Sequence, residues 1–240
     1  MTTRTLPAAL GLLSAVALVT AGCGVAGPTG PVTTEEHDVD AAVTAVRLDG
    51  TGDLRVSTGG PAASLSVTAH ESTLDELTAE VRDGVLVLGV RPGMRLRDLG
   101  PITYDLVLTE LHAVGVRGTG DVAASLTPVD TLEITVDGTG DVRATDVDVD
   151  ELRVEIDGTG SVGLTGTARS QEVRIGGTGS YEGAELSSED AVVTLDGTGN
   201  ADVEASRTLS ATVDGTGSVT YGGGAEVTSR VDGLGSVRER

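Results

Sequence analysis

Aspartates that flank a repeated Gly-Thr-Gly triplet are the residues of this chain best suited to chemistry. The residue before the triplet is Asp in six of its eight copies, and the residue after it is always Asp, Ser or Asn. Ca²⁺ prefers several hard oxygen ligands, and stacked copies of the triplet would bring such oxygens close together. The densest candidate group for a calcium site is Asp121, Asp137, Asp141 and Asp157.

A second interpretation of these side chains is structural. Asp, Ser and Asn all accept hydrogen bonds from the backbone amides of turns, which explains why they interchange after the triplet. The sequence leaves both interpretations open and indicates no other cofactor. The run Asp146–Glu151 resembles a calcium loop only superficially, because Glu151 stands where such a loop needs glycine. We interpret that run as an exposed acidic edge.

Catalytic signals are sparse. The histidines are His37, His70 and His112, and no serine lies in a G-x-S-x-G turn that would expose it as a nucleophile. We therefore predict that the protein is not an enzyme. Nucleic-acid binding is also excluded, because 16 Arg against 37 Asp and Glu give a net charge of −21, and Phe and Trp are absent.

The single cysteine, Cys23, follows a 16-residue apolar stretch that ends at the small residue Ala21, and then Gly22. This arrangement resembles the lipobox of a bacterial lipoprotein, which implies a signal peptide over residues 1–22 and lipidation of Cys23. The mature chain would then be anchored in the cell membrane on its extracytoplasmic face. The alternative is an ordinary secretory signal with an incidental thiol. Residues 23–40, rich in Gly, Pro and Thr, are expected to form a flexible tether.

The spacing of the triplets indicates which secondary-structure elements position the aspartates. From Gly118 the triplets are spaced by 20, 20, 19, 20, 18 and 18 residues, and aliphatic residues alternate with polar ones on both sides. This pattern is typical of half-buried strands in a stacked coil. We predict an all-β, parallel β-solenoid over residues 41–240 with about 18–20 residues per coil.

Glycine's tolerance of positive φ is the expected reason for the corners. The corner residues are Gly118, Gly120, Gly138, Gly140, Gly158 and Gly160. Aromatic side chains are expected to be too large for so narrow a coil.

Residues 41–117 are expected to form a β-rich segment that seals the N-terminal end of the core, ahead of the Gly-Thr-Gly coils of residues 118–240. Strand-like runs occupy 64–70, 77–81, 85–88 and 102–108, and Asp83-Gly84 predicts a hairpin. A short helix over 74–81 is the alternative for the second run. Arg238, Glu239 and Arg240 are expected to protect the last coil from edge-to-edge pairing.

The hairpin sequence EVRDGVLVL, the Val-x-Gly-Thr-Gly repeats and the ending ATVDGTGSVTYGGGAEVTSRVDGLGSV together resemble a known family. The family is the putative auto-transporter adhesin, head GIN domain group of bacterial surface proteins, and the resemblance covers Ala42 to Val237. It implies a right-handed β-helical solenoid and an adhesive role. It supplies no catalytic residues to carry over.

The sequence thus favours a lipid-anchored cell-surface solenoid that acts as a binding, adhesive or scaffold module. Its partner would be a polysaccharide or a surface protein, and it would present ladders of Thr, Asp and Arg to that partner. Two alternatives remain open: a polysaccharide-active β-helix enzyme and an envelope spacer that has no ligand.

Overall fold

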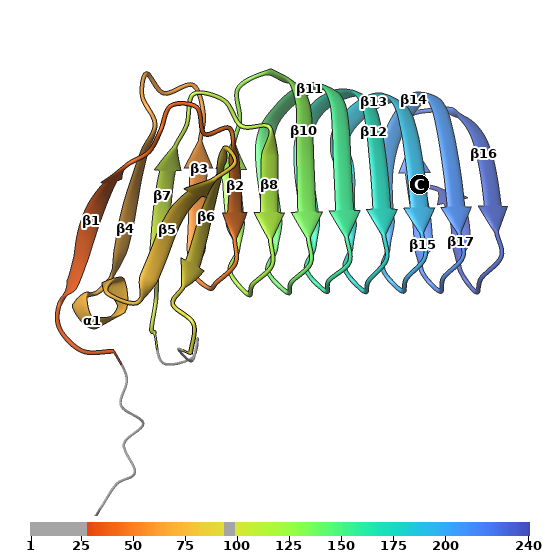
Figure 1. Ribbon diagram of the computed structural model, residues 1–240. Helices are drawn as coiled ribbons and strands as arrows, with labels where there is room; N and C mark the ends of the chain where they lie inside the picture. The colour runs from red at the N-terminus through yellow and green to blue at the C-terminus, as the bar shows by residue number, and fades with distance from the viewer. Residues whose placement is uncertain (1–27, 94–98) are drawn as a thin grey trace, which may run out of the picture.

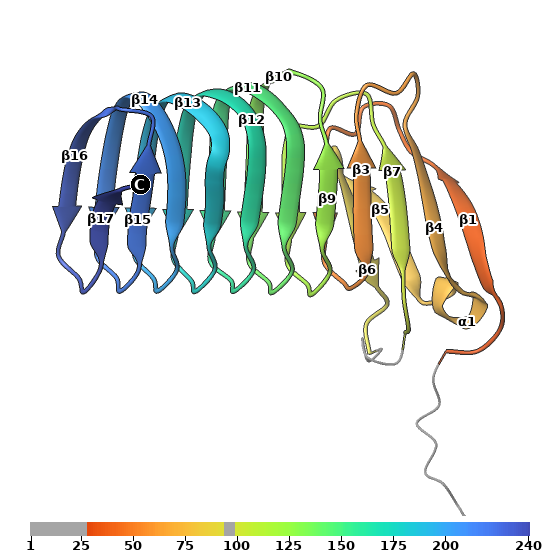
Figure 2. The same ribbon diagram turned by 180° about the vertical axis from the view of Figure 1, so that it is seen from behind.

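The computed structural model describes residues 28–93 and 99–240 as a right-handed solenoid of about six turns (Figure 1). Strands make up 62% of the structure and helix only 2%. In each coil a strand of the front sheet descends to a Gly-Thr-Gly corner, and the chain then climbs the back sheet (Figure 2). The predicted all-β, right-handed solenoid is confirmed.

The front sheet is parallel from β6 to β16. Its strands, in spatial order, are β5 (Leu77–Arg82), β6 (Val85–Val90), β2 (Ala45–Leu48), β8 (Ala113–Val116), β10 (Val129–Val136), the later parts of β11 (Val142–Ile156), β12 (Val162–Ile175), β13 (Tyr181–Leu195) and β14 (Ala201–Val213), and β16 (Glu226–Val231). Because β11 to β14 are long and bend, each of them belongs to both sheets.

The back sheet begins with antiparallel pairs and then becomes parallel. Its strands are β1 (Val32–Asp38), β4 (Ser64–His70), β7 (Thr103–Val107), β3 (Asp53–Ser57), β9 (Val122–Ser125), the early parts of β11 to β14, β15 (Ser218–Gly222) and β17 (Ser236–Glu239). A single helical turn, α1 (Glu71–Leu74), lies at the N-terminal end.

The spatial order at this end differs from the order in the sequence. Strands β2 and β3, with the first triplet between them, stack directly on β8 and β9. The residues between these two coils pass outward, so that β6 pairs with β2 and β7 pairs with β3 on the far side. This segment, extended by β1, β4 and β5, seals the end of the core as expected, and we call it the cap.

Two details of the cap differ from expectation. The predicted tether to residue 40 is wrong in its later part, because Val32–Asp38 pairs with β4 over seven residues. All seven side chains of β1 are exposed, so the apolar alternation that reveals a strand is absent. The helix considered for 74–81 is replaced by α1 and β5, while the predicted hairpin joins β5 to β6.

The core is a continuous stack of Val, Leu and Ile side chains, together with two tyrosines. Tyr104 and Tyr181 are each only 1% exposed, so the expectation that aromatic side chains do not fit the coil is wrong for these two. The Tyr181 hydroxyl donates to Gln171 Oε1 (2.9 Å), and Gln171 Nε2 donates to Ser188 Oγ (2.8 Å). This polar network inside the solenoid provides the hydrogen-bond partner that a buried hydroxyl requires.

The stacked corners owe their glycines to close packing rather than to positive φ. None of the corner glycines from Gly118 onward has a positive φ; among all the corners only Gly52, in the first copy, has one (φ 114°). An added Cβ at Gly118, Gly138 or Gly158 would overlap the carbonyl oxygen of the corresponding glycine one coil earlier. The prediction that these glycines mark corners is confirmed, but its mechanical reason is corrected.

Candidate binding surface

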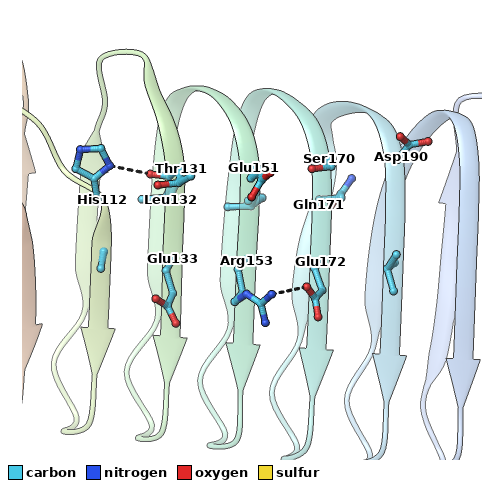
Figure 3. Close-up of a pocket in the computed structure, with 13 residues that line it drawn as sticks. His112, Thr131, Leu132, Glu133, Glu151, Arg153, Ser170, Gln171, Glu172 and Asp190 are labelled. Atoms are coloured by element: carbon cyan, nitrogen blue, oxygen red, sulfur yellow. Dashed lines mark hydrogen bonds and ion pairs between the residues drawn. The ribbon is translucent and has the colours of Figure 1, made fainter.

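A groove of about 490 Å³ crosses the front sheet between the start of β8 and the later part of β13 (Figure 3). Four inter-strand spacings separate β8 from β13, so the groove is about 19 Å long. It is open to solvent along its length, as a surface must be to receive an extended partner.

The strand alternation builds the groove. Leu132, Leu152 and Gln171 lie side by side in register, and these residues are 1–2% exposed because their side chains point into the core. Their backbone forms the floor of the groove. The residues on either side of each floor position point outward and form two walls. One wall holds Thr131, Glu151, Ser170 and Asp190, and the other holds Glu133, Arg153, Glu172 and Val192.

Ion pairs and hydrogen bonds between coils fix several of these side chains. Arg153 Nη2 lies 2.7 Å from Glu172 Oε2, and the His112 ring Nδ1 lies 3.2 Å from the Thr131 carbonyl oxygen. Asp190 accepts hydrogen bonds from Arg207 and from the Thr208 hydroxyl (2.6 Å), which hold the pKa of its carboxyl at about 2. The groove therefore presents mixed charges with an excess of carboxylates.

The groove does not assemble a nucleophile with a base. Ser170 Oγ donates to the carbonyl oxygen of Asp150 (3.3 Å), and His112 lies three strand spacings away, or about 14 Å. His70 Nδ1 contacts the Gly30 carbonyl oxygen at 3.0 Å in the cap. Acyl-transfer chemistry needs a serine and a histidine within hydrogen-bond reach, and the described residues do not provide that pair here.

The candidate calcium residues lie in two separate rows beside the corners. Asp121 Oδ1 accepts a hydrogen bond from the Asp141 amide, and Asp141 Oδ1 accepts one from the Ser161 amide, both at 2.8 Å. In the other row, Asp137 pairs with Arg117 Nε at 3.3 Å, and Asp157 lies beside Gly176. Throughout residues 28–93 and 99–240 no group of three or more His, Cys, Asp or Glu side chains is arranged to hold a metal ion.

The sequence also predicted a lipidation site and an exposed acidic run. Cys23 and the signal segment lie outside the described residues. The acidic run 146–151 forms an edge whose carboxylates bind neighbours: Asp148 accepts from the Thr167 hydroxyl (3.2 Å), and Asp150 pairs with Arg169 (2.8 Å). No helix in the part of the chain that the structure describes is long and apolar enough to cross a bilayer.

Sequence reasoning missed both the groove and the internal polar network. The available signal was Gln171, which occupies the position of Leu132 and Leu152 when the repeats are aligned. A polar residue at a core position indicates a buried hydrogen-bond network.

Comparisons with known proteins agree with the fold. The family model described as "Putative auto-transporter adhesin, head GIN domain" matches residues 42–225. No curated protein matches the chain. A putative adhesin from Bacteroides fragilis NCTC 9343 has a similar structure, with a TM-score of 0.83 and 22% identity, over 89% of this chain and 99% of that one.

Two further solved structures share the fold. A putative lipid binding protein from Parabacteroides distasonis ATCC 8503 is 20% identical with a TM-score of 0.72, and a putative adhesin from Parabacteroides merdae ATCC 43184 is 21% identical with a TM-score of 0.68. Both alignments cover 89% of this chain and 98% of the other.

Proposed function

Because the chain belongs to the family described as putative auto-transporter adhesin, head GIN domain, we propose that it is a non-enzymatic adhesive module of the cell surface. Its partner is an extended, repetitive polymer, of which an envelope or extracellular polysaccharide is the best candidate. The module is held to the membrane through a lipid on Cys23. The front-sheet groove is the single observation that carries the proposal.

The groove suits a repetitive polymer because its own walls repeat. Outward positions recur at the inter-strand spacing of about 4.8 Å, so successive units of an extended chain would meet similar positions. The residues along each wall offer carboxylates, hydroxyls and the Arg153 guanidinium, which together can bind the hydroxyls and charges of a glycan. The walls are held by the sheet rather than by loops, so little conformational freedom is lost on binding.

Binding is tested with the chain from residue 24 onward, on glycan arrays and against isolated cell-wall polysaccharide. The double variant Glu151→Ala/Arg153→Ala should weaken binding at least tenfold. The matched control, Arg143→Ala/Glu182→Ala, changes the same charges on the back sheet and should bind as the unaltered chain does.

Three outcomes would contradict the proposal, the first of them only in its choice of binding site. Loss of binding in the control but not in the groove variant would move the site to the back sheet. Release of cleaved glycan would indicate an enzyme, and absence of binding to any glycan or surface protein would indicate a spacer.

The anchor has its own test. Full-length chain should fractionate with membranes, and Cys23→Ala should release it; a membrane-bound Cys23→Ala variant would overturn the lipid anchor.

A further inference from the structure

The chain is fastened to the cap immediately after its proposed anchor. The Thr29 amide donates to Ser72 Oγ (2.9 Å), and the Glu71 amide donates to the Pro31 carbonyl oxygen (3.0 Å). The Gly30 carbonyl oxygen contacts His70 Nδ1 at 3.0 Å, and Pro28 packs beside Gly100. Residues 28–31 are therefore part of the folded domain and not part of a tether.

This leaves a very short connection to Cys23. Five residue steps separate Cys23 from Pro28, and a fully extended chain spans about 3.5 Å per step, so the reach is at most about 18 Å. The connection cannot be lengthened by releasing the next residues, because β1 pairs with β4 from Val32 to Asp38. The anchoring point must therefore lie within about 18 Å of Pro28, whose neighbours Thr29 and Pro31 bond to α1 at the capped end of the solenoid (Figure 1).

We propose that the α1 end of the cap, formed by residues 28–31 and Glu71–Leu74, faces the lipid headgroups of the membrane that carries the chain, and that the C-terminal coil points away. This inference rests on the proposed attachment through Cys23. Ten strand pairings separate β1 from β17 along the back sheet, so the two ends of the solenoid lie about 48 Å apart.

Charge on the corners keeps the solenoid from lying flat. Figure 1 shows the Gly-Thr-Gly corners along the same lower side as α1. Aspartates border these corners, among them Asp121, Asp137, Asp141, Asp157 and Asp214, and an anionic bilayer surface would repel them. A solenoid tethered at its cap therefore tilts its acidic corners away and holds the front-sheet groove clear of the bilayer.

The orientation is measured by energy transfer from a dye on the protein to acceptors on the headgroups of anionic liposomes. Cys23 is the only cysteine, so once it is lipidated an introduced cysteine is the only free thiol. The exposed residues Asp75, next to α1, and Thr228, on β16, provide a near and a far site. Full-length Asp75→Cys should show several-fold greater transfer than Thr228→Cys, and a long Gly/Ser insertion between Gly27 and Pro28 should remove most of this difference.

The outcomes separate this inference from the proposed anchor. Equal transfer at the two sites, or greater transfer at Thr228→Cys, in a chain that floats with the liposomes would overturn the orientation and leave the anchor intact. A chain that does not float, and whose Cys23 reacts with maleimide, would overturn the anchor and the orientation together. An unchanged difference after the Gly/Ser insertion would show that the short connection does not set the orientation.

Discussion

At Gly158 a hydrogen atom, rather than a methyl group, faces the carbonyl oxygen of Gly138 in the preceding coil. The same close approach recurs at each stacked corner. There the backbone amide of the middle residue of the triplet also donates a hydrogen bond to the preceding coil, as from Thr159 N to Gly138 O at 3.0 Å. The corner can therefore form its inter-coil hydrogen bonds only where no Cβ keeps the backbones apart.

Gly158→Ala should lower the free energy of unfolding by about 1–3 kcal/mol, because an added Cβ in a well-packed site must push the neighbouring backbone away. The control is Gly163→Ala on β12, where the nearest atom to an added Cβ is Glu182 Oε2 at 3.6 Å, an ordinary contact. The control should be neutral or slightly stabilising. Urea unfolding of both variants measures the difference, and equal midpoints would show that close packing is not the reason for the corner glycine.

The carboxylate of Asp141 acts as an acceptor for the next coil, and the chain itself shows that its charge is not required. Asn200, at the equivalent place, accepts a hydrogen bond from the Ser218 amide at 3.1 Å. We expect Asp141→Asn to keep the stability of the unaltered chain and Asp141→Ala to lose about 1 kcal/mol. The melting temperature should also be the same in excess Ca²⁺ and in chelator. A rise with Ca²⁺ that Asp141→Asn abolishes would instead establish a calcium site.

At the scale of elements, one polar network joins three long strands inside the core. Gln171 of β12 contacts Tyr181 and Ser188 of β13, and Ser188 Oγ donates to the Glu204 carbonyl oxygen of β14 at 2.7 Å. Tyr104 of β7 differs, because its buried hydroxyl has no hydrogen-bond partner among the described residues. Replacing each tyrosine by Phe therefore removes a hydroxyl that has a hydrogen-bond partner at position 181 and one that has none at position 104.

Tyr181→Phe should cost about 1–3 kcal/mol, since it leaves Gln171 Oε1 buried without its donor, whereas Tyr104→Phe should be neutral or stabilising. Burial raises the pKa of both hydroxyls above the ordinary value of 10.0. The unfolded chain therefore loses these protons first, so stability is full below about pH 10 and falls as the pH rises above it. Each Phe variant should show a shallower alkaline loss, and an unchanged pH profile would contradict the assignment.

The sequence predicted the repeating coils and most strands of the cap, but it missed β1 and the spatial order of the cap strands. Alternation around the triplet, as at Val154 and Ile156, identifies the coils because each residue must fill the same stacked interior. Strand β1 carries no such signal, since its partner β4 already covers the core and β1 remains exposed. The position of β6 outside β2 was also unpredictable, because it depends on pairing between segments far apart in the chain. The groove arises only when Leu132, Leu152 and Gln171 are placed side by side.

At the scale of the whole molecule, carboxylates far outnumber the arginines. The ion pairs are exposed, as with Arg153 and Glu172, whose side chains are 60% and 52% accessible. Such pairs contribute only about 0–1 kcal/mol each, so little stability is lost when salt screens them. The 37 acidic residues against 16 arginines, with aspartates stacked about 5 Å apart beside the corners, repel one another in the folded state more than in the expanded chain.

Added NaCl should therefore raise the melting temperature, because screening relieves repulsion among the carboxylates more than it weakens the exposed ion pairs. The rise should occur mainly below about 0.1–0.2 M, where the screening length shortens to about 10 Å and less. KCl should act equally, and CaCl₂ at matched ionic strength should add nothing beyond it if the aspartates hold no calcium. A melting temperature that falls with NaCl would show instead that the ion pairs between coils, and not the excess of carboxylates, dominate the electrostatics of the solenoid.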